Sequence, residues 1–100
     1  MRTFLSRSRT YVLWGYGATG RSLARALRAH GRHPVQIVEL HPRRIGQRIQ
    51  GAAVIPHAAL GGPPTPPIVV SVAGASARAL IRAQLWHKGF REGCDYVCAA

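Results

Sequence analysis

The sequence predicts an α/β fold, a small doubly wound parallel sheet of about five strands in the order 3-2-1-4-5. Three observations predict it. Short apolar runs alternate with longer amphipathic segments, as in parallel sheets that are covered by helices on both sides. The run at residues 68–73 is almost continuously apolar and β-branched, which is typical of a strand buried on both faces. A glycine-rich turn, GYGATG at residues 15–20, joins the first apolar run to the first amphipathic segment.

Five short segments have the apolar, β-favouring composition of strands: residues 11–14, 35–40, 53–55, 68–73 and 96–99. Two longer segments, 18–30 and 75–88, place apolar residues on one face at helical spacing, and a glycine follows each of them. Residues 57–60 predict one helical turn, and residues 43–50 a short turn of helix or an irregular crossover. The stretch GGPPTPP at 61–67 predicts a stiff surface loop, because proline is incompatible with the interior of helices and central strands.

The strand order follows from right-handed crossovers with a change of direction after the third strand. Ligands of such sheets bind beyond the carboxyl ends of the strands, at the switch between strands one and four. Residues 10–100 are predicted to form this one domain. Residues 1–9, rich in Arg and Ser and without acids, predict a flexible leader; a remnant of an upstream domain or a mitochondrial transit peptide are the alternatives.

The two cysteines, Cys94 and Cys98, do not have the spacing of a redox or zinc pair. In an extended strand both would lie on one face, so we expect both to be small core residues. No apolar run approaches the roughly 18 residues of a membrane span. The sequence therefore predicts a cytoplasmic protein without membrane insertion.

The charge is strongly basic, with 14 Lys and Arg residues against three acids and a formal net charge of +11. Such a charge suggests nucleic-acid binding. Arginines at helical spacing are nevertheless predicted opposite apolar residues in both helices: Arg21, Arg25, Arg28 and Arg32 opposite Leu23, Ala24 and Leu27, and Arg78 and Arg82 opposite Ala77, Leu80, Ile81 and Leu85. Because stacking aromatics are not interleaved with these cations, solvated helix faces with weak nonspecific affinity are favoured over a specific nucleic-acid partner.

The glycine turn satisfies the three conditions that give a G-x-G-x-x-G pattern its value: it closes a strand, opens a helix, and an acid follows about 20 residues later. Gly15 permits the tight turn, Gly17 lets the backbone approach a phosphate, and Gly20 allows close packing of helix on sheet. The amides of Ala18, Thr19 and Gly20 then point at the anion, assisted by the helix dipole.

The acid is Glu39, 22 residues after Gly17. It would accept hydrogen bonds from ribose hydroxyls; the alternative is a surface salt bridge to Arg43 or Arg44. Arg21 in the first helical turn opposes the helix dipole unless a phosphate lies nearby; the alternative is that it extends into solvent. Arg43 and Arg44 are placed to reach a ribose 2′-phosphate or a second phosphate, whereas Glu39 favours an unphosphorylated ribose, so these two signals conflict.

The remaining candidate residues do not form a catalytic or metal-binding pattern. Ala73 and Gly74 bring small residues to the far lip of the predicted crevice. No serine has the context of a nucleophile elbow, and no paired carboxylates flank a cleft. The five histidines lack metal-ligand spacing: His30, His33, His41, His57 and His87. The sequence therefore predicts no catalytic and no metal-binding residue.

Three segments carry a family resemblance: LWGYGATGRSLARAL, IVELHPRRIGQRIQGAAVI, and IVVSVAG followed by RALIRAQLWHKGFREGCDYV. Together they resemble bacterial Rossmann-like modules, namely the N-terminal nucleotide-binding domain of sugar O-acyltransferases of the sialic-acid acetyltransferase type. They are also similar to the CoA-binding-type domains of polysaccharide-biosynthesis proteins and to modules appended to bacterial glycosyltransferases.

The resemblance implies a nucleotide or UDP-sugar site formed by Gly15, Tyr16, Gly17, Glu39 and the Ala73-Gly74 turn. Relatives often carry two or three acids after the second strand, where this chain has Glu39-Leu40-His41, so its capacity to bind hydroxyls is reduced. The left-handed β-helix that performs acetyl transfer in the acyltransferases is absent from this sequence, and their activity is not carried over.

We therefore expect a non-catalytic Rossmann-like domain that binds NAD(P), CoA or a UDP-sugar, linked to bacterial polysaccharide or glycosyl-transfer metabolism. One alternative is a ligand-free interaction module that docks to a glycosyltransferase or to a second copy of itself. Another is a basic nucleic-acid-binding protein. Enzyme activity is least expected, because a dehydrogenase normally needs a second domain to hold its substrate.

Overall fold

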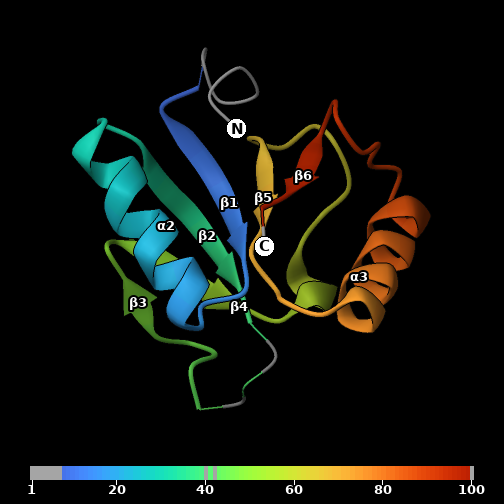
Figure 1. Cartoon of the computed structure of the whole chain (residues 1–100), viewed down its shortest axis with the longest axis horizontal. Coiled ribbons are helices and arrows are strands. Elements are labelled where there is room, and N and C mark those ends of the chain that lie inside the picture. Colours follow the sequence, from blue (N-terminus) through green and yellow to red (C-terminus); the bar gives the residue numbers. More distant parts are fainter. Residues whose placement is uncertain (1–7, 40, 42, 100) are drawn as a thin grey trace.

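One six-stranded sheet, in the order β3-β4-β2-β1-β5-β6, organises the computed structural model, which describes residues 8–39, 41 and 43–99 (Figure 1). Its strands are β1 (Thr10–Trp14), β2 (His33–Val38), β3 (Arg48–Ile49), β4 (Ala52–Ile55), β5 (Ile68–Val70) and β6 (Tyr96–Cys98). Two helices, α2 (Ala18–Ala29) and α3 (Ala75–His87), and a 3-10 turn, η1 (His57–Ala59), complete it. All strand pairs are parallel except β3 with β4. This arrangement is compatible with a Rossmann-like fold.

The number and order of strands differ from the prediction of five in the order 3-2-1-4-5. The difference arises in residues 43–50, where a helical turn or irregular crossover was expected and β3 forms instead. Gln50 and Gly51 have φ angles of 52° and 82°, the positive values that a two-residue hairpin turn requires. The chain therefore folds back, and β3 pairs antiparallel with β4 at the edge of the sheet.

The predicted elements also shift at their ends. Both helices end one residue earlier than predicted. The second strand begins at His33 and ends at Val38, and Leu40, its predicted last residue, lies outside the described residues, as does most of the predicted leader, residues 1–7. The fourth strand ends at Val70 rather than at 73, because its neighbour β1 ends at Trp14, whose carbonyl accepts the bond from Ser71 N–H at 2.9 Å.

The core lies in two layers, one on each face of the sheet. Alternate residues of β1 point to opposite faces. Tyr11 and Leu13 pack with Ala24 and Leu27 of α2: this layer also holds Ile37, Ala52, Val54 and Val69. The other layer packs against α3 and comprises Val12, Trp14, Val38, Leu60, Ile68, Val70, Ile81, Leu85, Phe90 and Tyr96. Figure 1 shows the two helices flanking the sheet. All three residues of β5 are buried, which confirms the prediction of a strand covered on both faces.

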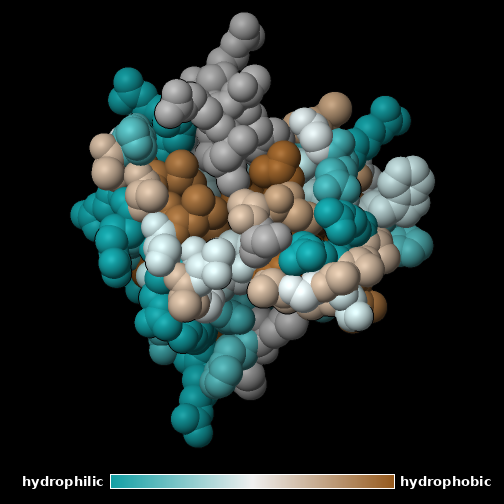
Figure 2. Space-filling model, in the orientation of Figure 1, coloured by the Kyte–Doolittle hydropathy of each residue, from teal (hydrophilic) through white to brown (hydrophobic). Residues whose placement is uncertain are grey.

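The prediction of an arginine-bearing outer face opposite core residues is confirmed for α2 and wrong in part for α3. Arg21, Arg25 and Arg28 are exposed, and Figure 2 shows hydrophilic side chains at the left edge, where α2 lies, and at the lower tip, over the loop that follows β2. In α3, Leu80 is 68% exposed, although it was predicted to face the core with Ile81. Arg82 forms an ion pair with Glu92 at 3.0 Å.

The cysteine prediction is wrong at one position. Cys94 is exposed because it lies in the turn before β6, where Asp95 N–H bonds to the carbonyl of Arg91 at 2.8 Å. Cys98 lies in β6 and is half-buried, and this burial raises the pKa of its thiol. In the described part of the chain, neither helix is long and apolar enough to cross a membrane.

Candidate functional site

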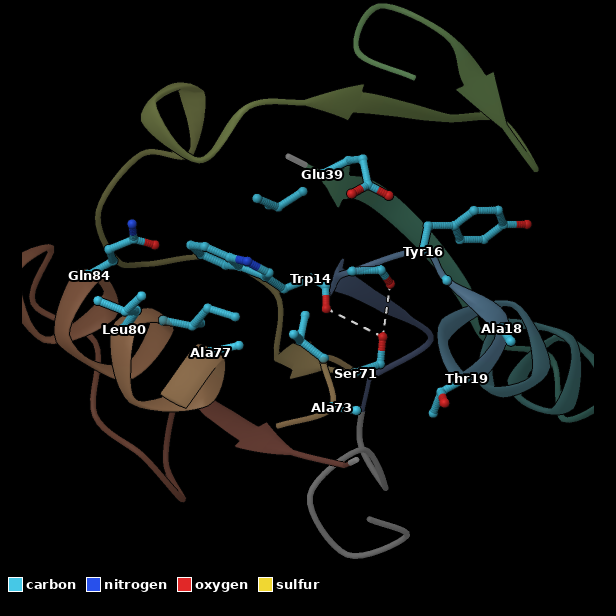
Figure 3. Close-up of a pocket in the computed structure, with 15 residues that line it drawn as sticks. Trp14, Tyr16, Ala18, Thr19, Glu39, Ser71, Ala73, Ala77, Leu80 and Gln84 are labelled. Carbon is cyan, nitrogen blue, oxygen red and sulfur yellow. Dashed lines mark hydrogen bonds between the residues drawn. The ribbon is translucent and has the colours of Figure 1, made fainter. Parts of the chain in front are cut away.

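A cavity of about 440 Å³ lies at the carboxyl ends of β1, β2 and β5 (Figure 3). Its position is the one predicted for a ligand, at the switch between the first and fourth predicted strands. Its walls come from the β1–α2 turn, the ends of β2 and β5, and one face of α3: Trp14, Gly15, Tyr16, Gly17, Ala18, Thr19, Val38, Glu39, Ser71, Val72, Ala73, Ala77, Leu80, Ile81 and Gln84.

Gly15 and Gly20 are glycines for structural reasons. Gly15 has a φ of 99°, and a Cβ there would lie 2.7 Å from Val72 Cγ2. A Cβ at the buried Gly20 would overlap the carbonyl oxygen of Gly15 and lie 2.8 Å from Ser71 Oγ. Both glycines therefore allow the first turn of α2 to sit directly against the sheet.

Neither close packing nor backbone conformation requires a glycine at position 17. Its φ is −82°, which any residue adopts, and a Cβ built on it would meet no atom within 4 Å. It is also the N-cap of α2, a position where Ser, Thr, Asp or Asn would bond to the free amides of the helix. The chain thus leaves open space, and no capping side chain, at a residue that lines the cavity.

The amides that begin α2 are available to a ligand. The first helical hydrogen bond runs from Arg21 N–H to the carbonyl of Gly17 at 2.9 Å, so the N–H groups of Ala18, Thr19 and Gly20 precede it. The first turn of α2 carries no acid, and no side chain caps it. The turn therefore presents the partial positive charge of the helix N-terminus, and no acidic side chain in the turn neutralises it.

Ser71 fixes the glycine turn to the sheet. Its side chain is buried, and its hydroxyl oxygen lies 2.8 Å from the carbonyl oxygen of Gly15 and 3.3 Å from that of Trp14 (Figure 3). Its backbone N–H donates to the Trp14 carbonyl at 2.9 Å. Sequence reasoning missed this role, although one hydroxyl within the apolar run IVVSVA was the available signal.

The two arginines nearest the turn contact Tyr16. Arg44 donates from Nη1 to the Tyr16 carbonyl at 2.9 Å, and its guanidinium lies 5.6 Å from the centre of the tyrosine ring. Arg21 lies 6.0 Å from the same ring and is exposed. These are cation–π distances, and neither arginine lines the cavity. Arg43 is exposed and is also outside the cavity wall.

Glu39, predicted within the second strand, instead follows β2, and it lines the cavity. Its backbone N–H donates to the Ile55 carbonyl at 3.0 Å, and Oε1 accepts from the N–H of His41 at 3.4 Å. Figure 3 shows its carboxylate on the same side as Tyr16. Among the described residues of the wall, Glu39 is the only charged one.

Seven of the predicted site residues meet in the cavity wall: Gly15, Tyr16, Gly17, Ala18, Thr19, Glu39 and Ala73. Four do not line it: Gly20, Arg21, Arg43 and Gly74. Gly20 instead packs the helix on the sheet, and Gly74 is the N-cap of α3.

The apolar part of the wall was not predicted. Trp14 is 1% exposed and stacks on His57, with ring centroids 6.4 Å apart and planes at 21°. Val38, Val72 and three residues of α3, namely Ala77, Leu80 and Ile81, complete this part. Its formation depends on the position at which α3 crosses the sheet, which no local pattern specifies.

Chemically, the amides that begin α2 could bind an anion, and the Glu39 carboxylate could accept hydrogen bonds from hydroxyl groups. Within residues 8–39, 41 and 43–99, no three His, Cys, Asp or Glu side chains are grouped to hold a metal ion. The one buried polar side-chain atom without a partner in this part is the hydroxyl of Tyr11, in the α2 layer outside the cavity wall. Burial, with a smaller contribution from Tyr16, raises the pKa of Tyr11 to about 12.

No protein-family model matches the chain, and comparisons with curated proteins and with solved structures also find no match. The resemblance to sugar O-acyltransferase domains therefore stays a prediction.

Proposed function

We propose that the chain is a non-catalytic, Rossmann-like domain that binds a nucleotide-containing ligand in the cavity at the carboxyl edge of its sheet. One observation carries the proposal. Gly17 combines an ordinary backbone conformation with open space where a side chain would be, beside helix amides that nothing in the first turn neutralises. A diphosphate held by the backbone explains both features.

The charges of the wall favour some nucleotides over others. Glu39 accepts hydrogen bonds from ribose hydroxyls and repels a 2′-phosphate. The described wall holds no cation, and the nearest arginines are engaged with Tyr16. NAD(H) or a UDP-sugar therefore fits this wall better than NADP(H) or CoA, which carry an additional phosphate.

Reaction chemistry belongs to another component. The described part of the wall holds one carboxylate, one serine engaged with the backbone, one threonine and no histidine. These groups can bind and orient a ligand but do not form a nucleophile–base pair. The resemblance to modules of polysaccharide biosynthesis and glycosyl transfer supports a role as the nucleotide-binding part of such a system.

Calorimetric titration of NAD(H), NADP(H), CoA and UDP-sugars tests the proposal with a matched pair of variants. Gly17→Val fills the space that a phosphate would occupy and should abolish binding. Gly61→Val is the control, because Gly61 also has open space around its Cβ and lies outside the wall. Absence of binding by every ligand at millimolar concentration would contradict the proposal.

A second candidate is an interaction module that docks to a second copy of the chain. Leu80 and Trp86 on α3 are 68% and 71% exposed, whereas the outer face of α2 carries arginines. Trp86 lies beside Arg82, Arg91 and Glu92, where an acid offsets part of the positive charge. In a chain with a net charge of +11, two copies therefore repel each other less here than across the arginines of α2.

A further inference from the structure

We propose that the α3 half of the cavity is a slot for a planar ring with a hydrogen-bond donor and acceptor side by side, a nucleobase or a nicotinamide, and that Gln84 selects this ring through its side-chain amide. The inference rests on the proposed function and deepens it. It concerns the part of the wall opposite the glycine turn, where neither phosphate nor ribose would lie.

The slot has an apolar floor and an apolar side. α3 turns one face to the cavity, because Ala77, Leu80, Ile81 and Gln84 are spaced three and four residues apart. Figure 3 shows Leu80 and Gln84 on this helix, with Trp14 between them and the glycine turn. Trp14 lines the floor but is 1% exposed and has His57 stacked on its ring, so it supports the slot from beneath. The accessible apolar surface comes from Val72, Ala77 and Leu80, and such a surface suits an aromatic ring.

Leu80 is an apolar side chain left in water at the edge of this slot. It is 68% exposed although it lines the cavity. A ring packed against it would remove its surface from water. Trp86, 71% exposed on the same helix but outside the wall, provides the comparison.

Gln84 is the one polar side chain that α3 contributes to the described wall. Its residue is half-buried, and its amide makes no hydrogen bond within the part of the chain that the structure describes. A glutamine amide offers a donor and an acceptor side by side. The edges of nucleobases, and the carboxamide of nicotinamide, offer the complementary pair. A carboxylate or a second phosphate would use only the donor and would find no cation in the described part of this wall.

The test compares ligands that share a diphosphate but differ in their rings: NAD⁺, ADP-ribose, UDP and UDP-glucose. Gln84→Leu preserves size and helix propensity and should weaken binding of the ring-bearing ligand about tenfold, the typical effect of one lost hydrogen bond. Leu80→Ser should weaken it similarly, and Trp86→Ser should leave it unchanged. If Gln84→Leu weakens the binding of NAD⁺ but not that of ADP-ribose, the ring in the slot is nicotinamide. If it weakens the binding of UDP, the ring is a nucleobase.

Fluorescence gives a second measurement that does not depend on changing Gln84. The chain has two tryptophans, so Trp86→Phe leaves Trp14 as the sole reporter beneath the slot. The ring-bearing ligand should change its emission, and inorganic pyrophosphate should not. If Gly17→Val abolishes binding while Gln84→Leu and Trp14 emission show no effect, the slot is refuted and the proposed function stands. If no ligand binds the unaltered protein, both are refuted.

Discussion

Gly17 and Gly20 belong to one motif but are glycines for different reasons. Gly20→Ala forces a Cβ into the backbone of Gly15 and should destabilise the protein by about 1–3 kcal/mol. Gly17→Ala adds a Cβ in open space and should change stability by less than about 1 kcal/mol, the range of N-cap substitutions. Urea denaturation of the two variants measures the difference. Equal losses of stability would contradict the division between a packing glycine and a binding glycine.

Tyr11 provides a prediction with a pH dependence. Its buried hydroxyl has no partner in the described structure, so Tyr11→Phe should raise the free energy of unfolding at neutral pH by about 1 kcal/mol. Its pKa is about 12 in the folded protein against an ordinary value of 10.0. Above pH 10 the unfolded state therefore loses this proton first, and the stability due to Tyr11 falls as pH rises toward 12.

The Tyr11→Phe variant lacks the part of the loss of stability above pH 10 that is due to Tyr11. Its advantage over the unaltered protein should widen between pH 10 and 12, by at most about 1.4 kcal/mol per pH unit. Thermal or urea unfolding across that range measures it. A constant difference between the two proteins would show that Tyr11 does not hold its proton in the folded state.

At the scale of elements, the β3–β4 hairpin contains a residue under backbone strain. Gln50 has a φ of 52°, a left-handed conformation that asparagine tolerates better than glutamine. Gln50→Asn creates the Asn-Gly pair that such turns prefer and should stabilise the protein by up to about 1 kcal/mol. Urea or thermal unfolding measures the change. A loss of stability on Gln50→Asn would contradict the assigned turn.

The long elements could be predicted from the sequence, and the short or non-local ones could not. β1, the glycine turn and α2 follow from local patterns that agree with one another. β3 has two residues, too few for any periodicity to show. The orientation of α3 was ambiguous, because Ala, Leu and Trp occur around much of the helix and its apolar face is poorly defined by spacing. That ambiguity is why Leu80 was assigned to the core.

At the scale of the whole molecule, one part of the candidate site could be predicted from the sequence and another part could not. The glycine turn and Glu39 could be predicted because strand, turn and acid have fixed spacings. Trp14, Ser71 and Gln84 could not, because their places in the wall depend on residues that are distant in the sequence. The positions of Arg43 and Arg44 likewise depend on the direction of the chain after β2, and the structure brings Arg44 to the carbonyl of Tyr16.

The net charge distinguishes the rival functions by the sign of their salt dependence. Salt screens the repulsion between two copies at +11, so self-association through α3 should increase with ionic strength and be abolished by Trp86→Ser. Nonspecific binding to nucleic acid should instead weaken steeply. Light scattering measures the self-association, and fluorescence anisotropy of a labelled nucleic acid measures the nonspecific binding. A protein that stays monomeric at high salt would exclude the second-copy candidate.

The central claim is that the backbone of the glycine turn holds the phosphates of a nucleotide. NMR titration with NAD(H) and UDP-sugars tests it most directly, by following backbone amide resonances of the unaltered protein. The account predicts the largest shifts at Ala18, Thr19 and Gly20, and their loss in Gly17→Val. Shifts confined to the arginine-bearing face of α2, or no shifts at millimolar ligand, would contradict it.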